Sequence, residues 1–446
     1  MDAAADQQSE HGRRASYAEV LRHRNFALVF VGQTVSQAGN GAFQVALGWA
    51  VYSVTGSAAD MGVVLAANAI PQVLLFLFGG VLGDRLSRRS VILAADAAAG
   101  LVTAALAVLA AGPGLNFGVL LVGAALLGMT SALYGPAYGA IVPDVLPGEL
   151  VLRGNALLGA SANLARVCGP ALAGVLYALG GAWIVFGLDA ASFLVSAACM
   201  VATAVPAARA VYKGTMRGDI REGLAYAGRQ RWLQLVMAIG LVANVLCVAP
   251  LFVLLPAIVR HAHGGPGALG LVIAVQMAVA TLSALLIPRF GRLGDSGVGL
   301  AVLAGALGLG VVVVGVGHSV AVLLLGMAVV GIGFGFNVVE STLLQLLVPR
   351  ALLSRIYSLM LAASFALLPV GYAASGVLAQ QVGLTAVMCF GGLALLIISL
   401  WASFSPSLRE LSAVAESGGT KSTSTESTST ESAGTGSGAA EVGGTS

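Results

Sequence analysis

The chain has 446 residues, of which 58% are hydrophobic and 9% are charged, and its formal net charge is +3. A soluble fold could not hydrate so apolar a surface, which excludes the soluble classes of protein. The arginines are divided among short segments and form no single stripe, so no nucleic-acid interface is expected. All four cysteines lie inside apolar runs without CxxC spacing, so no disulfide framework and no metal site are expected. No cofactor is expected either.

Twelve apolar runs follow one another along the chain, and each is long enough to cross about 30 Å of hydrocarbon as a helix. The first run is too long for a cleaved signal and is expected to stay as an anchor. The sequence thus predicts an all-α, multi-pass membrane protein. The runs cover residues 25–54, 61–82, 91–111, 115–139, 155–179, 183–205, 233–259, 267–288, 298–317, 320–346, 354–379 and 384–404.

The basic residues predict an orientation. With both termini on one side of the membrane, 20 of the 22 lysines and arginines fall in segments on that side. Cationic loops stay in the cytoplasm, so both termini are expected there, and the protein in the inner (plasma) membrane. The predicted divisions are a cytoplasmic N-terminal segment (1–24), two six-helix bundles (25–205 and 233–404), a cytoplasmic linker (206–232) and a disordered cytoplasmic tail (405–446).

Two polar segments have the pattern of surface helices. Before the first span, apolar positions recur at helical spacing over residues 17–24, which favours a short helix on the inner surface; a disordered lead is the alternative. In the linker, residues 219–226 could form an amphipathic helix.

A stripe of amides follows one face of the first span. Gln33, Gln37, Asn40 and Gln44 recur at helical spacing, and amides facing lipid would lack hydrogen-bond partners. The stripe should therefore face the protein interior or a watery cavity. Hydrogen bonding between helices and lining of a substrate site both remain open.

The turn after the second span carries one acid and three arginines in the order Gly-x-Leu-x-Asp-Arg-x-x-Arg-Arg, at Gly80, Leu82, Asp84, Arg85, Arg88 and Arg89. This order resembles the signature loop of the major facilitator superfamily, with Ser87 in place of the usual glycine. The resemblance implies two pseudo-symmetric six-helix bundles around a central cavity. It also implies a cytoplasmic gate in which Asp84 meets the start of the eleventh helix and Arg85 or Arg88 holds Asp144. A carboxylate is favoured at a helix N-terminus by the free N–H groups.

The fifth span contains Gly169, Pro170 and Gly174. Such a sequence bends a helix and lets a neighbouring helix approach closely. It resembles the motif that marks antiporters in the superfamily, with Ala173 in place of one of its glycines.

The two halves of the chain repeat weakly. Residues 291–295 resemble residues 80–84 at an offset of 211, and Val348-Pro349 resembles Val142-Pro143 at an offset of 206. Parallel repeats of this kind are typical of the superfamily. The resemblance extends over about residues 20–405, and its nearest branch includes macrolide exporters and the enterobactin exporter.

The source of energy is inferred from the charged residues inside the spans. The chain has no phosphate-binding loop for ATP, and the GxGxxG pattern at residues 265–270 follows no strand, so no enzyme activity is expected. Proton coupling would then involve the carboxylates Asp96, Asp189 and Glu340, because a charge within a membrane span is costly. Glu340 is the leading candidate, whereas Asp96 and Asp189 could be structural acids.

Arg166 lies deep in the fifth span and needs an acid or several carbonyls as partners. We expect Asp96 or Glu340 to pair with it. Formation and breaking of the pair would link proton binding to helix motion, and a static bridge that only positions helices is the alternative.

These patterns predict a proton-driven exporter of a small, largely apolar organic molecule, such as an antibiotic or a secondary metabolite, working by alternating access as a monomer in the bilayer. The alternatives are an importer or uniporter on the same fold and a membrane sensor or scaffold that transports nothing. Aromatic and amide groups in an apolar cleft can accept varied ligands. The expected lining residues are Gln33, Gln37, Asn40, Gln44, Tyr134, Tyr138, Asn337 and Glu340.

Overall fold

The computed structural model describes residues 17–83, 88–139, 141–204, 216–289, 297–349 and 352–406, and the regular structure in these ranges is entirely helical. The helices of the first half are α2 (Tyr17–Arg22), α3 (Arg24–Thr55), α4 (Ala58–Gly83), α5 (Arg88–Ala111), α6 (Phe117–Gly139), α7 (Val142–Val145), α8 (Gly148–Gly180) and α9 (Ala182–Ala202). Those of the second half are α10 (Met216–Arg229), α11 (Arg231–Val242), η1 (Ala243–Val248), α12 (Ala249–His261), α13 (Pro266–Leu286), η2 (Ile287–Arg289), α15 (Gly297–Val316), α16 (Val320–Gly333), α17 (Phe336–Leu347), α18 (Leu353–Ala366), α19 (Leu368–Val382) and α20 (Leu384–Ser403).

Each predicted apolar run falls on a helix or on consecutive helices, and no run extends more than two described residues beyond them. Ten helical segments of the described chain are long and apolar enough to cross a membrane, judged by length and composition. The other two predicted spans are α3, with 32 residues, and α4, with 26. Helices are expected because hydrocarbon offers no partner for backbone polar groups, which must therefore bond within their own segment.

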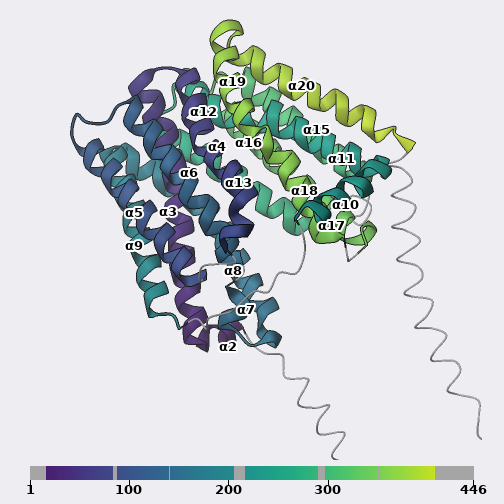
Figure 1. Ribbon diagram of the computed structural model, residues 1–446. Helices are drawn as coiled ribbons and strands as arrows, with labels where there is room; N and C mark the ends of the chain where they lie inside the picture. Colours follow the sequence, from purple (N-terminus) through teal and green to yellow (C-terminus); the bar gives the residue numbers. More distant parts are fainter. Residues whose placement is uncertain are drawn as a thin grey trace, which may run out of the picture.

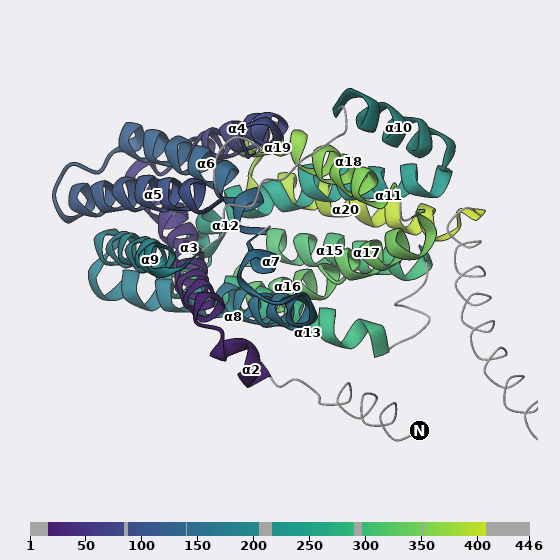
Figure 2. The ribbon, with the colours of Figure 1, turned by 60° about the horizontal axis from the view of Figure 1, so that its bottom comes forward.

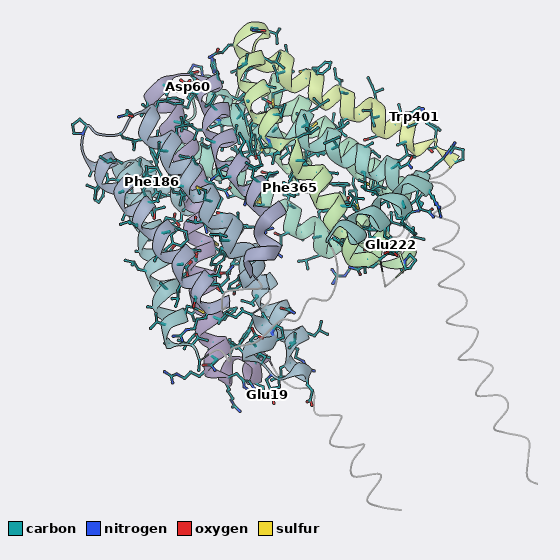
Figure 3. The ribbon with its side chains drawn as sticks, in the orientation of Figure 1. Glu19, Asp60, Phe186, Glu222, Phe365 and Trp401 are labelled. Carbon is teal, nitrogen blue, oxygen red and sulfur yellow. The ribbon has the colours of Figure 1, made fainter. Side chains whose placement is uncertain are left out.

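The helices of the first half pack on one another without a break inside any span. α3 packs against α8 and α9, α5 against α6 and α9, and α4 against α6. In Figure 1 this group, purple to teal, stands on the left. Its charged residues Glu19 and Asp60 lie at opposite ends of the group, as Figure 3 shows.

The second half differs because three of its spans are interrupted. The π-helical turn η1 separates α11 from α12, Phe334 and Gly335 separate α16 from α17, and Leu367 separates α18 from α19. A π-helical turn inside a span is uncommon and often marks a functional position. α15 packs against α16 and α20, and α13 packs against α16.

Two seams join the halves, and Figure 2 shows α4 beside α19 in one and α8 beside α13 in the other. In the α4–α19 seam the two helices approach closely, because a Cβ added to Gly376 would lie only 2.7 Å from the Ala59 Cα. The Gln380 side chain also donates a hydrogen bond of 3.0 Å to the Ser57 hydroxyl. In the α8–α13 seam, a Cβ on Gly174 would lie 3.1 Å from the Gly267 Cα.

Both seams lie near the same end of the molecule, which we call the outer end. They involve the first turns of α4 and α13 and the last turns of α8 and α19, whereas α2 and α10 lie at the opposite, inner end. The halves therefore touch at the outer end and diverge towards the inner end.

Both segments that were predicted to form surface helices are helical, as α2 and α10. Val20 of α2 is fully buried and packs with Phe26 of α3. The Tyr226 hydroxyl of α10 donates a hydrogen bond of 3.5 Å to the Leu347 carbonyl oxygen at the end of α17, and the Gln234 side chain donates to carbonyl oxygens at the end of α10. The linker helix is thus attached to the second half.

Candidate functional site

The amide stripe of α3 divides into an inner pair and an outer pair. Gln33 is 6% exposed, and its amide oxygen accepts a hydrogen bond from the Tyr134 hydroxyl of α6. The Tyr138 ring stacks on Tyr134, with the ring centroids 5.5 Å apart. Gln33 therefore joins α3 to α6 in this conformation and lines no open space.

Asn40 and Gln44 are exposed, while Gln37 is half-buried. Gln44 is exposed although both of its neighbours in the chain are buried. Gly48, one turn further along the same face, approaches Pro256 of α12, since a Cβ there would lie 3.4 Å from the Pro256 Cγ. Asn40 and Gln44 therefore face the second half of the molecule and line the space between the halves.

Two of the three carboxylates inside the spans lie within the first half and away from this space. Asp96 of α5 is 1% exposed, and its Oδ2 accepts a hydrogen bond of 2.7 Å from the Ser196 hydroxyl of α9. Asp189 of α9 is also 1% exposed, with the Ser192 hydroxyl 3.4 Å away. The second oxygen of each carboxyl group is buried without a hydrogen-bond partner among the described residues.

Glu340 lies on α17, which follows the break at Gly335 in the tenth span. Its side chain is half-buried. Asn337 and Gln345 of the same helix are exposed, and the Asn337 amide donates a hydrogen bond of 3.0 Å to the Phe334 carbonyl oxygen. Glu340 therefore lies beside an exposed polar face in the inner half of its span.

The expected ion pair of Arg166 is absent from this conformation. Arg166 of α8 is exposed and forms no ion pair with Asp96 or Glu340 in the part of the chain that the structure describes. The physical reason is rotational, because the Asp96 side chain turns into the contact between α5 and α9 while Glu340 belongs to the other half. The depth of a residue in its span predicts only its level in the membrane, not the direction in which it points.

Part of the predicted gate falls outside the described residues. Asp84 and Arg85 are the residues outside the description. Gly80 lies in α4, and Arg88 is the first residue of α5, but the structure does not describe the Arg88 side chain. Asp144 is half-buried in the short helix α7. The contact of Asp84 with the eleventh helix and the pairing of Arg85 or Arg88 with Asp144 therefore stay predictions.

The remaining arginine of the predicted gate, Arg89, has a visible structural role. Its guanidinium donates hydrogen bonds to the carbonyl oxygens of Met200 (3.2 Å) and Val201 (2.7 Å). These carbonyls close α9, so Arg89 caps the C-terminus of that helix, where a cation is favoured by the helix dipole.

The glycines of the fifth span lie at two different contacts. A Cβ on Gly169 would lie 2.8 Å from the Ala38 carbonyl oxygen of α3, inside the first half. Gly174 lies in the α8–α13 seam, where Pro170 also contributes its carbonyl oxygen against Gly270. The predicted close approach of neighbouring helices is therefore present, on both sides of α8.

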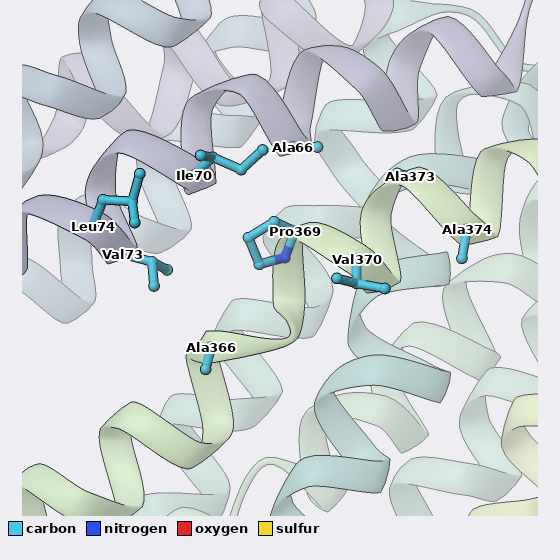
Figure 4. Close-up of a pocket in the computed structure, with 9 residues that line it drawn as sticks. All are labelled: Ala66, Ile70, Val73, Leu74, Ala366, Pro369, Val370, Ala373 and Ala374. Carbon is cyan, nitrogen blue, oxygen red and sulfur yellow. The ribbon is translucent and has the colours of Figure 1, made fainter.

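The sequence reasoning missed an apolar cleft between α4 and the break of the eleventh span, with a volume of about 470 Å³. Figure 4 shows Pro369 at the kink between α18 and α19, facing the α4 side chains. Pro369, three residues after the end of α18, was an available signal, because proline interrupts a helix. The lining residues are Ala66, Ile70, Val73, Leu74, Ala366, Pro369, Val370, Ala373 and Ala374.

Comparisons with known proteins agree with this architecture. The multidrug efflux pump Tap of Mycolicibacterium fortuitum is 28% identical over 403 residues, which cover 87% of this chain and 97% of the relative. A mutant of the nucleoside transporter NupG shares the fold with a TM-score of 0.70 at 13% identity, over 85% of this chain and all of that structure. A bacterial homologue of ferroportin shares it with a TM-score of 0.67 at 16% identity, over 86% of this chain and 99% of that structure.

The profile of the family described as transmembrane secretion effector matches residues 15–430, almost the whole of the chain. The members of this family and the relatives above are membrane transporters and not enzymes. The chain belongs to the transmembrane secretion effector family of the major facilitator superfamily.

Proposed function

We propose that the protein exports small, largely apolar organic molecules across the inner membrane by alternating access, in exchange for protons. The observation that carries this proposal is the position of the two seams. The halves touch at the outer end, while the mid-span amides Asn40 and Gln44 are exposed between them. A binding site of this kind is open to one side of the membrane and closed to the other.

The orientation of that opening follows from the charges. The inner end carries α2, α10 and both ends of the described chain, and most of the basic residues that the structure describes lie in segments at this end. With the positive segments in the cytoplasm, both termini are cytoplasmic and the conformation is open to the cell interior. An exporter loads its substrate from that side.

The chemistry of the space supports small, largely apolar substrates. The α4–α19 cleft is lined by alanine, valine, leucine, isoleucine and proline, and its volume of about 470 Å³ lies within the range of drug-sized ligand pockets. A few amides near an apolar wall orient ligands without requiring one shape. The relative named a multidrug efflux pump agrees with this substrate class.

Glu340 is the proposed proton carrier. It lies beside the exposed face of α17, so water from the inner opening can reach it, whereas Asp96 and Asp189 are each 1% exposed inside the first half. An ionised carboxylate inside a span costs several kcal/mol unless it is paired or hydrated. Proton binding at Glu340 therefore changes the free energy of closing the space around it.

Transport into inverted membrane vesicles tests the proposal. An imposed pH gradient, acidic inside, is expected to drive accumulation of a lipophilic fluorescent drug panel by the wild type. Glu340→Gln is expected to abolish accumulation, while Glu149→Gln, at an exposed carboxylate at the start of α8, retains it. Uptake in the opposite direction would identify an importer, and gradient-driven export that survives Glu340→Gln would remove this residue from the mechanism.

A further inference from the structure

Arg166 occupies a narrow strip between two buried faces of α8. Ala165 and Gly169 are buried against α3, and Pro170 and Gly174 are buried against α13. At about 100° per residue, Arg166 falls between these two faces. The exposed Arg166 side chain therefore leaves α8 at the place where α3 and α13 flank it, which is the space between the halves.

The other exposed residues of α8 confirm that this helix has two different open faces. Asn155 and Asn163 are exposed along the part of the helix that leads from the inner end to Arg166. On the opposite side, Leu164, Val175 and Leu179 are exposed at 63%, 56% and 77%. The apolar face is compatible with lipid and the polar face with water, so Arg166 lies on the water-facing side of α8.

The packing of α3 on α8 places Arg166 at the level of the exposed amides. A Cβ on Gly41 would lie 3.4 Å from the Ala165 carbonyl oxygen, and Gly41 directly follows Asn40 in α3. Asn40 and Arg166 are thus neighbours in depth on adjacent helices. Both are exposed towards the same space.

The Arg166 charge has no counter-charge in the part of the chain that the structure describes. A guanidinium stays ionised in proteins and presents five N–H donors. Arg166 makes no hydrogen bond or ion pair there, and the carboxylates of Asp96 and Asp189 are bound by serine hydroxyls inside the first half. It lies 14 residues from the nearer end of α8, about 20 Å along the axis, which is too deep for a lipid headgroup.

We propose that Arg166 binds the anionic group of an amphipathic organic substrate, a carboxylate or a sulfonate, with Asn40 beside it as a neutral hydrogen-bonding group. The inference rests on the proposed export function and narrows its substrate class from apolar molecules to amphipathic anions. A planar guanidinium pairs with the two oxygens of such a group by parallel hydrogen bonds. The apolar part of the molecule then lies towards the apolar surfaces of the space.

Two fluorescent probes that share one skeleton test the assignment by binding alone. 8-Anilinonaphthalene-1-sulfonate is anionic, and N-phenyl-1-naphthylamine is its neutral counterpart. Each probe is titrated into the purified full-length protein in phosphatidylcholine nanodiscs, with empty discs as background. The ratio of the two affinities is measured for wild type, Arg166→Gln, Arg166→Lys and the matched control Arg260→Gln, an arginine over the Tyr52 ring at the outer end of α12.

The affinity for the sulfonate is expected to fall about tenfold in Arg166→Gln, while the affinity for the neutral probe stays unchanged. Arg166→Lys keeps the charge and is expected to retain most of the preference, and Arg260→Gln is expected to behave as wild type. An unchanged ratio in Arg166→Gln, or an equal loss of both probes, overturns the assignment. These titrations measure binding and not transport. A negative result can therefore be distinguished from a failure of the proposed export, which is tested by accumulation in vesicles.

Discussion

A methyl group at Gly270 should force the outer end of the molecule apart. Its Cβ would lie 2.8 Å from the Gly174 Cα and 2.9 Å from the Gly174 nitrogen, and closer still to the Pro170 carbonyl oxygen, whereas ordinary contacts begin at 3.4 Å. The shortfall against the Gly174 Cα is 3.4 − 2.8 = 0.6 Å. Backbone atoms cannot rotate away as a side chain can, so α8 and α13 must separate.

Overpacking of this kind costs about 1–3 kcal/mol. In the proposed alternating-access cycle the seam is closed only in the conformation that opens to the inner end, so the cost falls on that conformation alone. The equilibrium between inward-open and outward-open forms is then expected to shift about 5- to 150-fold towards the outward-open form.

Spin labels at Pro113 and His318, exposed loop residues at the outer end of the two halves, report this shift as a longer distance. The labels are introduced as cysteines after replacement of the four native cysteines. Gly267→Ala is the control on the same helix, because its Cβ meets only the Gly174 carbonyl oxygen, at 3.8 Å. The same distance distribution in Gly270→Ala and Gly267→Ala would refute the reasoning.

Three further predictions concern single substitutions. Gln44→Ala should raise the KM for transport about three- to tenfold without changing the unfolding temperature, because Gln44 is exposed. Gln33→Ala should lower the unfolding temperature, because it breaks the hydrogen bond to Tyr134 of α6. The opposite pattern would contradict the exposed position of Gln44 and the buried position of Gln33. Arg89→Gln should lower the free energy of unfolding by about 1–2 kcal/mol, since two carbonyls of α9 lose their charged donor, and Arg24→Gln, at an exposed position, should leave thermal unfolding in detergent unchanged. Gly391→Ala should lower the unfolding temperature, because its Cβ would overlap a carbonyl oxygen of η1; a wild-type melting curve would show that α20 can move away.

The helices were predictable from the sequence because hydrocarbon offers the backbone no hydrogen-bond partners, so each span must form its hydrogen bonds within its own segment. All twelve predicted runs lie in helices, and the short helices α2 and α10 also formed where their periodicity indicated. The interruptions were not predicted. Gly335 could equally have been a close-packing glycine, and no residue in Ala243–Val248 requires a π-helical turn.

The candidate site was less predictable because function depends on which way a side chain points. Gln33 and Gln44 belong to one stripe in the sequence and lie only about 20° apart around the helix, yet Tyr134 covers the first while the second is exposed. For Arg166, the prediction of a costly and functional charge did not reveal its direction. That direction depends on α3 and α13, which are distant in the sequence.

The seams have a consequence for how such a pump adapts to new compounds. Closure at the outer end depends on backbone meeting backbone at Gly174, Gly270 and Gly376, where a first added carbon already crowds the neighbouring helix. For the proposed exporter, a mutation that alters the substrate range without harming transport is therefore expected among the wall residues around Asn40 and Ile70 and not at these glycines. In the proposed exporter, the substrate range can then change through the wall residues while the glycine contacts that close the outer end stay the same.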